Sequence, residues 1–343
     1  MADHMGEFDL IARYFKRPAI HSVLGVGDDC ALLQPAPGTQ MAISSDMLVQ
    51  GRHFFPDVDP QTLGHKALAV NLSDLAACGA KPLAFTLALA LPSVDEAWLA
   101  AFSKGLFALA DAHDCELIGG DTTQGPLNIC ITVFGEVPVV SGRSQALLRS
   151  GAQAGDDIYV SGTLGDARLA LDVLYGKLLS VPPEVFGPAR ARLETPSPRV
   201  ALGIALRGIA SAAIDVSDGL LGDLGHILKA SQVGAVINTS IAIKLVASHE
   251  YWMRSSGIFG IKNDQKTGLQ TCLAHVLAGG DDYELLFTAP PTHRDAVLAA
   301  AHTSGTPVTR VGQIQSAPGL RLIDEHGAEV ANTFRSFDHF SRP

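Results

Sequence analysis

The chain has 343 residues, of which 47% are hydrophobic and 17% charged, and its formal net charge is −10. This length favours two domains, and this composition excludes a disordered chain. No lysine- or arginine-rich run offsets the negative charge, which argues against binding to nucleic acid or to an anionic membrane surface.

Three further features narrow the class of protein. The apolar segment 82–92 is shorter than the roughly 20 residues of a membrane-spanning helix, so we interpret it as a buried strand. The N-terminal sequence MADHMGEFDLIARYF lacks a basic stretch followed by an apolar one, so we expect no signal peptide and a cytoplasmic protein. The five cysteines never approach a C-x-x-C spacing, which supports neither a disulfide framework nor a zinc site.

The first half of the sequence predicts a mixed α/β domain. An apolar run from residue 41 ends in Ser44-Ser45-Asp46, and another from residue 117 ends in Gly119-Gly120-Asp121. The Gly/Ser-rich stretch 140–157 is the best candidate for a junction, so we place the domains at 1–145 and 146–343. Apolar spacing predicts the other elements of this half: a helix over 63–80, a strand over 82–91, a helix over 94–113 and a strand over 127–137.

The second half predicts an α/β domain. It opens with a strand over 157–161, and the sequence DVSDG at 215–219 leads into a helix over 220–231. A Pro-rich stretch covers 182–198, and the segment 251–270 has no clear period, so we expect it to be a loop or an insertion. The sequence GGDDYE at 279–284 then precedes a strand and a helix over 292–304.

Aspartates recur where apolar runs meet small or polar residues. For any single one, a turn or a helix N-cap is the simplest explanation. Several together indicate a shared site, because neighbouring carboxylates repel one another unless cations are bound. Oxygen ligands without Cys or His at ligand spacing favour Mg²⁺, and no G-x-x-x-x-G-K-[ST] sequence indicates a P-loop kinase. The recurring acids are Asp28, Asp29, Asp46, Asp74, Asp121, Asp215, Asp218, Asp281 and Asp282.

Eight segments, taken in order, closely resemble the thiamine-monophosphate kinases of bacteria. They are GEFDLIARYF, GVGDDCALL, AISSDMLVQGRHF, NLSDLAACGAKP, LIGGDTT, RSGAQAGD, AIDVSDGLLGDLGHI and GGDDYELLF, and the resemblance is weakest over 244–270. It implies the fold of the aminoimidazole-ribonucleotide-synthetase-like superfamily. In that fold the sheet of an N-terminal α+β domain pairs across a homodimer, and a C-terminal α/β domain closes over the nucleotide and the acceptor.

The resemblance also implies an activity, the Mg²⁺-dependent transfer of the γ-phosphoryl group of ATP directly to thiamine monophosphate. A phosphate monoester has a second pKa of roughly 6, so this acceptor is already largely ionised at neutral pH and needs no general base. Several Mg²⁺ ions held by aspartates would screen the repulsion between the two phosphate groups. Whether K⁺ assists is left open. The expected partners are ATP, thiamine monophosphate and a second copy of the chain, with neither nucleic acid nor membrane.

The site residues follow from the motifs that match. The implied metal ligands are Asp29, Ser44, Ser45, Asp46, Asp74, Asp121, Asp215 and Asp218, of which Asp46, Asp121 and Asp215 are the implied catalytic residues. The implied ATP contacts are Gly120, Asp121, Arg149 and Ser217, and the implied acceptor contacts are His53, Asp281 and Phe337. Two departures affect the acceptor side, because relatives often carry Glu at 281 and Tyr at 337. Outside this context, His53 is typical of a structural histidine and Arg149 of a solvated charge.

Two other functions compete with this one. An ATP-dependent synthetase of the same superfamily would also use ATP and Mg²⁺, but the segments GDDCALL and NLSDLAACGA favour the kinase. A non-catalytic protein that binds Mg²⁺ and nucleotide would leave the acceptor unphosphorylated. The formation of thiamine diphosphate therefore distinguishes among the three.

Overall fold

The computed structural model of the protein describes residues 6–178, 181–250 and 265–335. The chain separates into two compact units, unit 1 with residues 1–75 and 80–146, and unit 2 with residues 76–79 and 147–343. Among the described residues, no helix is both long enough and apolar enough to cross a membrane.

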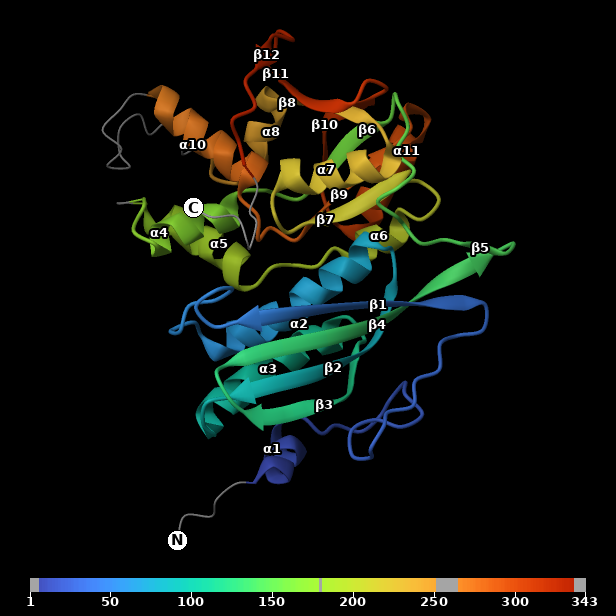
Figure 1. Ribbon diagram of the computed structural model, residues 1–343, viewed down its shortest axis with the longest axis vertical. Coiled ribbons are helices and arrows are strands. Elements are labelled where there is room, and N and C mark those ends of the chain that lie inside the picture. Colours follow the sequence, from blue (N-terminus) through green and yellow to red (C-terminus); the bar gives the residue numbers. More distant parts are fainter. Residues whose placement is uncertain (1–5, 179–180, 251–264, 336–343) are drawn as a thin grey trace. The chain divides into compact units, whose positions relative to one another are not determined.

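Unit 1 is built around a five-stranded sheet with the order β1-β4-β2-β3, in which β5 pairs with β4 (Figure 1). Strands β1 and β2 are antiparallel to β4, and β3 is parallel to β2. The strands are β1 (Thr39–Val49), β2 (Lys81–Leu91), β3 (Glu116–Gln124), β4 (Asn128–Val140) and β5 (Arg143–Ser144), and the helices are α1 (Glu7–Tyr14), α2 (Pro60–Ala77) and α3 (Glu96–Ala112).

One face of the unit 1 sheet is covered by helices. Alternate residues of β4 are buried, and at Gly135 an added Cβ would lie 3.1 Å from the Leu75 side chain of α2. Helices α2 and α3 also touch through glycine, because an added Cβ at Gly64 would lie 2.1 Å from the carbonyl oxygen of Phe102. The side chains of β1 that point to the other face include the exposed Ile43 and Met47. We refer to the two faces as the helix-covered face and the open face.

Unit 2 contains a seven-stranded mixed sheet with the order β12-β11-β8-β10-β6-β9-β7. Its strands are β6 (Asp157–Ser161), β7 (Ala212–Val216), β8 (Gly234–Asn238), β9 (Glu284–Ala289), β10 (Val308–Gln315), β11 (Gly319–Ile323) and β12 (Glu329–Val330). Its helices are α4 (Asp166–Leu174), α5 (Pro183–Glu194), α6 (Val200–Ala205), α7 (Leu220–Ser231), α8 (Thr239–Ala242), α10 (Gln265–Ala278) and α11 (Arg294–Ser304), with 3-10 turns η1 (Ile243–Leu245) and η2 (Pro291–His293). Buried side chains of β6, β7 and β9 pack with those of α7 in one core.

The predicted fold class is confirmed, since both units are mixed α/β and the elements predicted from apolar spacing are present. One prediction was wrong. Residues 265–270, expected to belong to a loop or an insertion, begin helix α10, whereas 251–264 lie outside the described residues. The Pro-rich stretch 182–198, to which no element had been assigned, contains helix α5, because Pro183 stands at its start, where a missing N–H costs nothing, and the helix accommodates Pro188.

Candidate functional site

A cavity of about 620 Å³ lies in unit 1 beside strand β3. Apolar side chains of α1, among them Phe8, Ile11 and Phe15, line part of it. Asp28, Asp29 and the β3 segment 117–122 line the rest, so that carboxylates and backbone polar groups meet an apolar wall. Its volume is in the range of small-molecule sites, which is roughly 300–1,000 Å³.

Gly120 brings bare backbone to this cavity. Its φ is +146°, and an added Cβ would lie 1.8 Å from the carbonyl oxygen of Leu87 on β2. No side chain fits at that distance, so only glycine allows β3 to run this close to β2. The residues Gly119-Gly120-Asp121, where the sequence shows the end of an apolar run, are therefore part of strand β3. Asp121 follows the glycine at the cavity wall.

Glu116, at the start of β3, anchors the segment that leads to Asp28 and Asp29. Its carboxylate accepts the backbone N–H groups of Ile20 (3.0 Å), His21 (3.1 Å) and Ser22 (3.0 Å). Partial burial opposes ionisation, but these hydrogen bonds outweigh it and lower the pKa of Glu116. The sequence analysis missed this residue, because nothing in its neighbourhood indicates which distant amides it accepts.

A second group of polar side chains joins strand β1 to helix α2. The Ser44 hydroxyl donates a hydrogen bond to the Asp74 carboxylate, and the Asp46 N–H donates to Asn71 Oδ1 at 2.9 Å. Burial and the nearby charge of Asp74 raise the pKa of Asp46 to about 6. The negative charges of Asp46 and Asp74 repel each other, and a bound divalent cation would relieve this repulsion.

The strand register places Asp46 and Asp121 in neighbouring rows of the sheet. Asp46 is aligned with Ile131, Leu87 and Gly120, whereas Asp121 is aligned with Ala88. Asp46 faces the helices, on the same side of β1 as the buried Leu48. The regular alternation of side chains is interrupted beside Asp121, because the Cβ direction of Gly120 meets the backbone of β2. The Ser45 hydroxyl is on the open face, where it hydrogen-bonds to the Thr132 hydroxyl at 2.9 Å.

Two sets of acids are therefore described in unit 1: Asp74 lies near enough to Asp46 to raise its pKa, and Asp28, Asp29 and Asp121 line the cavity. Consistently, no three His, Cys, Asp or Glu side chains come close enough to hold a metal ion within the described ranges. The turn-or-cap explanation is wrong for four of the predicted acids, since Asp46, Asp121 and Asp215 lie within strands and Asp74 lies within α2.

In unit 2, side chains of helix α7 hydrogen-bond to the backbone of two segments that carry predicted site residues. Near its N-terminus the Asp223 carboxylate accepts the N–H groups of Ser217 and Asp218, each at 3.1 Å, and burial raises the pKa of Asp223 to about 7. At its C-terminus the Ser231 hydroxyl donates to the Arg149 carbonyl oxygen at 3.2 Å. Asp215 precedes the first segment at the end of β7 and is 6% exposed.

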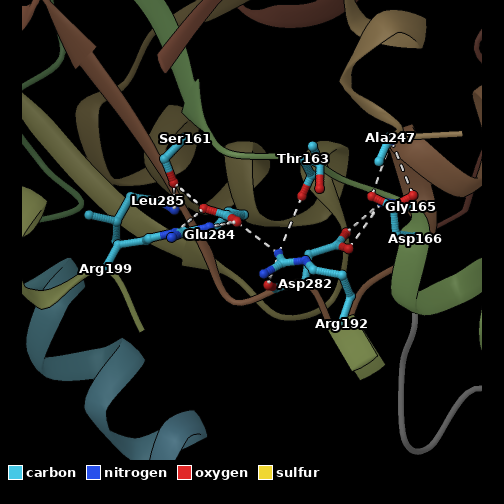
Figure 2. Close-up of polar contacts among 10 residues, drawn as sticks. All are labelled: Ser161, Thr163, Gly165, Asp166, Arg192, Arg199, Ala247, Asp282, Glu284 and Leu285. Atoms are coloured by element: carbon cyan, nitrogen blue, oxygen red, sulfur yellow. Dashed lines mark hydrogen bonds and ion pairs between the residues drawn. The ribbon is translucent and has the colours of Figure 1, made fainter. Parts of the chain in front are cut away.

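The sequence analysis also missed a buried ion cluster in unit 2 (Figure 2). The Glu284 carboxylate is fully buried, accepts from Ser161 at 2.5 Å, and pairs with Arg192 at 2.7 Å and Arg199 at 2.6 Å. Burial also raises the pKa of Asp282 well above its usual value. Arg192 and Arg199 are the first and last residues of the sequence RLETPSPR, most of which belongs to the Pro-rich stretch 182–198.

Two predicted acceptor contacts have different outcomes. His53 Nδ1 accepts the Val49 N–H at 3.0 Å, so the neutral imidazole carries its proton on Nε2. It can therefore donate a hydrogen bond to an anion through Nε2. Phe337 lies outside the described residues.

Comparisons with known proteins identify relatives along almost the whole chain. The family described as AIR synthase related protein, N-terminal domain, matches residues 27–137, and its C-terminal domain counterpart matches 153–325. A curated thiamine-monophosphate kinase from Escherichia coli (strain K12) is 45% identical over 342 residues, which cover 98% of this chain and 99% of that protein. One from Haemophilus influenzae is 43% identical, with 98% of each chain covered.

Solved structures are similar as well. Thiamine-monophosphate kinase from Stenotrophomonas maltophilia K279a has a TM-score of 0.78 and 44% identity, covering 94% of this chain and 96% of that chain. A structure described as AaThiL complexed with AMPPCP and TMP has a TM-score of 0.72 and 26% identity, covering 90% and 89%. The hydrogenase maturation protein HypE of E. coli, at 21% identity and a TM-score of 0.70, is similar in fold.

Proposed function

The chain belongs to the thiamine-monophosphate kinase family, and we propose that it transfers the γ-phosphoryl group of ATP to thiamine monophosphate, giving thiamine diphosphate and ADP. The observation that carries this proposal is the 45% identity over 98% of the chain to a curated enzyme of that name. The 620 Å³ cavity, with its apolar wall and the carboxylates of Glu7, Asp28, Asp29 and Asp121, supports it.

We propose that Mg²⁺ binds at the two sets of acids in unit 1. Mg²⁺ binds through one or two carboxylates and shares its other positions with water and phosphate oxygens, so a pair of aspartates is a sufficient protein contribution. Asp29 and Asp121 would hold metal beside Gly120 and the ATP phosphates, and Ser44, Asp46 and Asp74 would hold it on the helix-covered face. Bound there, the ions would neutralise charge that develops on the transferring phosphoryl group.

The remaining residues of the proposal belong to unit 2. Asp215 and Asp218 are proposed as further metal ligands, Arg149 and Ser217 as ATP contacts, and Asp281 as a contact to the cationic thiazolium of the acceptor. In unit 1, Ser45 faces away from Asp46, so its hydroxyl does not join the ligands on the helix-covered face. We further propose a cytoplasmic homodimer, in which pairing of the open face would bury Ile43 and Met47.

Acceptor choice tests this function. We expect turnover of thiamine monophosphate and little or none of free thiamine, because the alcohol of thiamine is barely ionised at neutral pH and needs a positioned base. The measurement is chromatography of the products after incubation with Mg²⁺ and ATP. Efficient phosphorylation of free thiamine, or no thiamine diphosphate from the monophosphate, would contradict the proposal.

His53→Ala tests the acceptor side separately. Since the Nε2–H of His53 can donate to an anion but the neutral ring offers no free acceptor nitrogen, we expect the variant to raise the KM for thiamine monophosphate more than it lowers kcat. Steady-state kinetics with each substrate varied in turn would measure this. A variant that loses all turnover while still binding the acceptor would instead assign His53 to the chemical step.

A further inference from the structure

The segment between α10 and β9, residues 279–283, has an unusual backbone. Asp281 (φ +60°) and Tyr283 (φ +52°) are both left-handed although neither is glycine. Side chains disfavour this region, so such a backbone persists only where its surroundings fix it. We call this segment the acceptor loop, because it carries Asp281.

One edge of the acceptor loop is fixed by strand β7 and the residue after it. The Asp281 N–H donates to the Ser217 carbonyl oxygen, and the Tyr283 N–H donates to the Val216 carbonyl oxygen, both at 2.8 Å. At Gly280 an added Cβ would lie 2.6 Å from the Ser217 carbonyl oxygen, so the two backbones are in direct contact. The position of Asp281 is thereby tied to Ser217.

The other edge is held by Arg192 of helix α5 (Figure 2). Its Nη2 donates to the carbonyl oxygen of Asp282 at 2.9 Å and to Glu284 Oε1 at 2.7 Å. The Asp282 carboxylate in turn accepts the Gly165 N–H at 3.0 Å. Arg192 thus contacts the residue that lies between the two left-handed positions.

Arg199 differs from Arg192 in one respect. It binds the same Glu284 carboxylate, through Nε at 2.7 Å and Nη2 at 2.6 Å, but its side-chain hydrogen bonds within the described residues go to Glu284 alone. The side chains of the two arginines are 19% and 21% exposed. They are therefore matched in burial and charge partner, although Arg199 binds Glu284 through two nitrogens and Arg192 through one, and of the two only Arg192 contacts the acceptor loop among the described residues.

We propose that Arg192 is a positioning residue for acceptor binding, which fixes the left-handed backbone of the acceptor loop and thereby the Asp281 carboxylate. We assign it to the loop rather than to the reactants, because its Nη2 donates to the Asp282 carbonyl, to Glu284 and, at 3.5 Å, to the Thr163 carbonyl oxygen. The catalytic part of this inference rests on the proposed function, in which Asp281 faces the thiazolium cation. The structural part, in which Arg192 fixes the backbone of the acceptor loop, does not rest on the proposed function.

The test compares Arg192→Lys with Arg199→Lys. Lysine retains the charge near Glu284, but its side chain is shorter and lacks the rigid guanidinium plane that aims Nη2 at the Asp282 carbonyl and the Glu284 carboxylate together. We expect Arg192→Lys to raise the KM for thiamine monophosphate by about tenfold and to leave the KM for ATP within about twofold. In Arg199→Lys, and in Arg190→Lys on the same helix, both KM values should stay near those of the unaltered protein.

Hydrogen exchange gives a readout that does not depend on activity. The amides of Asp281 and Tyr283 should exchange faster in Arg192→Lys than in Arg199→Lys, because only Arg192→Lys removes the hydrogen bond to the Asp282 carbonyl oxygen. Equal exchange and equal KM values in the two variants would overturn the proposal and leave both arginines as stabilising residues only. Faster exchange in a protein that does not phosphorylate thiamine monophosphate would support the positioning role and contradict the proposed function.

Discussion

Asp46→Asn is expected to abolish phosphoryl transfer while it stabilises the metal-free protein. The asparagine cannot neutralise Mg²⁺, so we expect turnover to fall by at least about 10²-fold at saturating Mg²⁺, as when other transition-state charge stabilisers are removed. In the absence of metal, the negative charge of Asp46 destabilises the folded protein, because burial and the charge of Asp74 raise the pKa of this carboxyl to about 6. The variant should therefore gain on the order of 1–2 kcal/mol at pH 7.5.

The sign of this effect depends on pH. The folded-state pKa of Asp46 is above the usual aspartate value, so the folded protein holds the proton more tightly than the unfolded chain. The destabilisation by the Asp46 charge is absent below about pH 4 and complete above about pH 6. The gain in free energy of unfolding from Asp46→Asn should therefore disappear as the pH falls through this range. Urea unfolding in EDTA at pH 7.5 and pH 4.5 measures it. Near-normal turnover, or lower stability at pH 7.5, would contradict the metal assignment.

Asp111→Asn provides the control for this pair of measurements. Asp111 forms a surface ion pair with Arg17, in which the two side chains are 61% and 41% exposed. Such pairs contribute little to stability. This variant should keep its turnover and its free energy of unfolding at both pH values.

Glu284→Gln is expected to be the most destabilising of the conservative substitutions discussed here. The Glu284 carboxylate is fully buried and compensates two arginines, so an uncharged amide leaves both guanidinium groups without their counter-ion. Removing one partner of a buried ion pair costs about 3–5 kcal/mol. Urea unfolding followed by circular dichroism should show this loss.

Glu194→Gln is the matched control for Glu284→Gln. Among the residues that the structure describes, Glu194 pairs with Arg190 alone, four residues earlier on the same helix, and that arginine is 43% exposed. Helical pairs of this kind contribute about 0.3–0.5 kcal/mol, so the variant should unfold close to the unaltered protein. Equal losses in the two variants would show that the buried cluster has no special role in stability.

The sequence predicted much of the fold because apolar spacing reports directly on burial. The helix expected over 220–231 and the strand expected over 157–161 appear with those bounds, since their apolar residues face the core of unit 2. The Pro-rich stretch 182–198 was assigned no element, although a proline at the first helical position supports a helix, and α5 also accommodates Pro188 in its interior.

The candidate site was only partly predictable. Aspartates beside apolar runs were found from their spacing, but their place in the sheet depends on strand register, which pairs Asp46 with Ile131 and Asp121 with Ala88. Glu116 and Arg192 were missed for a related reason. Their partners lie 94 to 96 and 90 to 92 residues away, and sequence spacing carries no information on contacts at such separations.

The most direct test of the central claim follows the labelled phosphoryl group. The protein would be incubated with Mg²⁺, thiamine monophosphate and ATP labelled with ³²P at the γ-position, and the products separated. Direct transfer to the acceptor phosphate predicts that the label appears in thiamine diphosphate, in step with ADP formation and without inorganic phosphate. Label released only as inorganic phosphate, as a synthetase would release it, or label retained in ATP, would contradict the account.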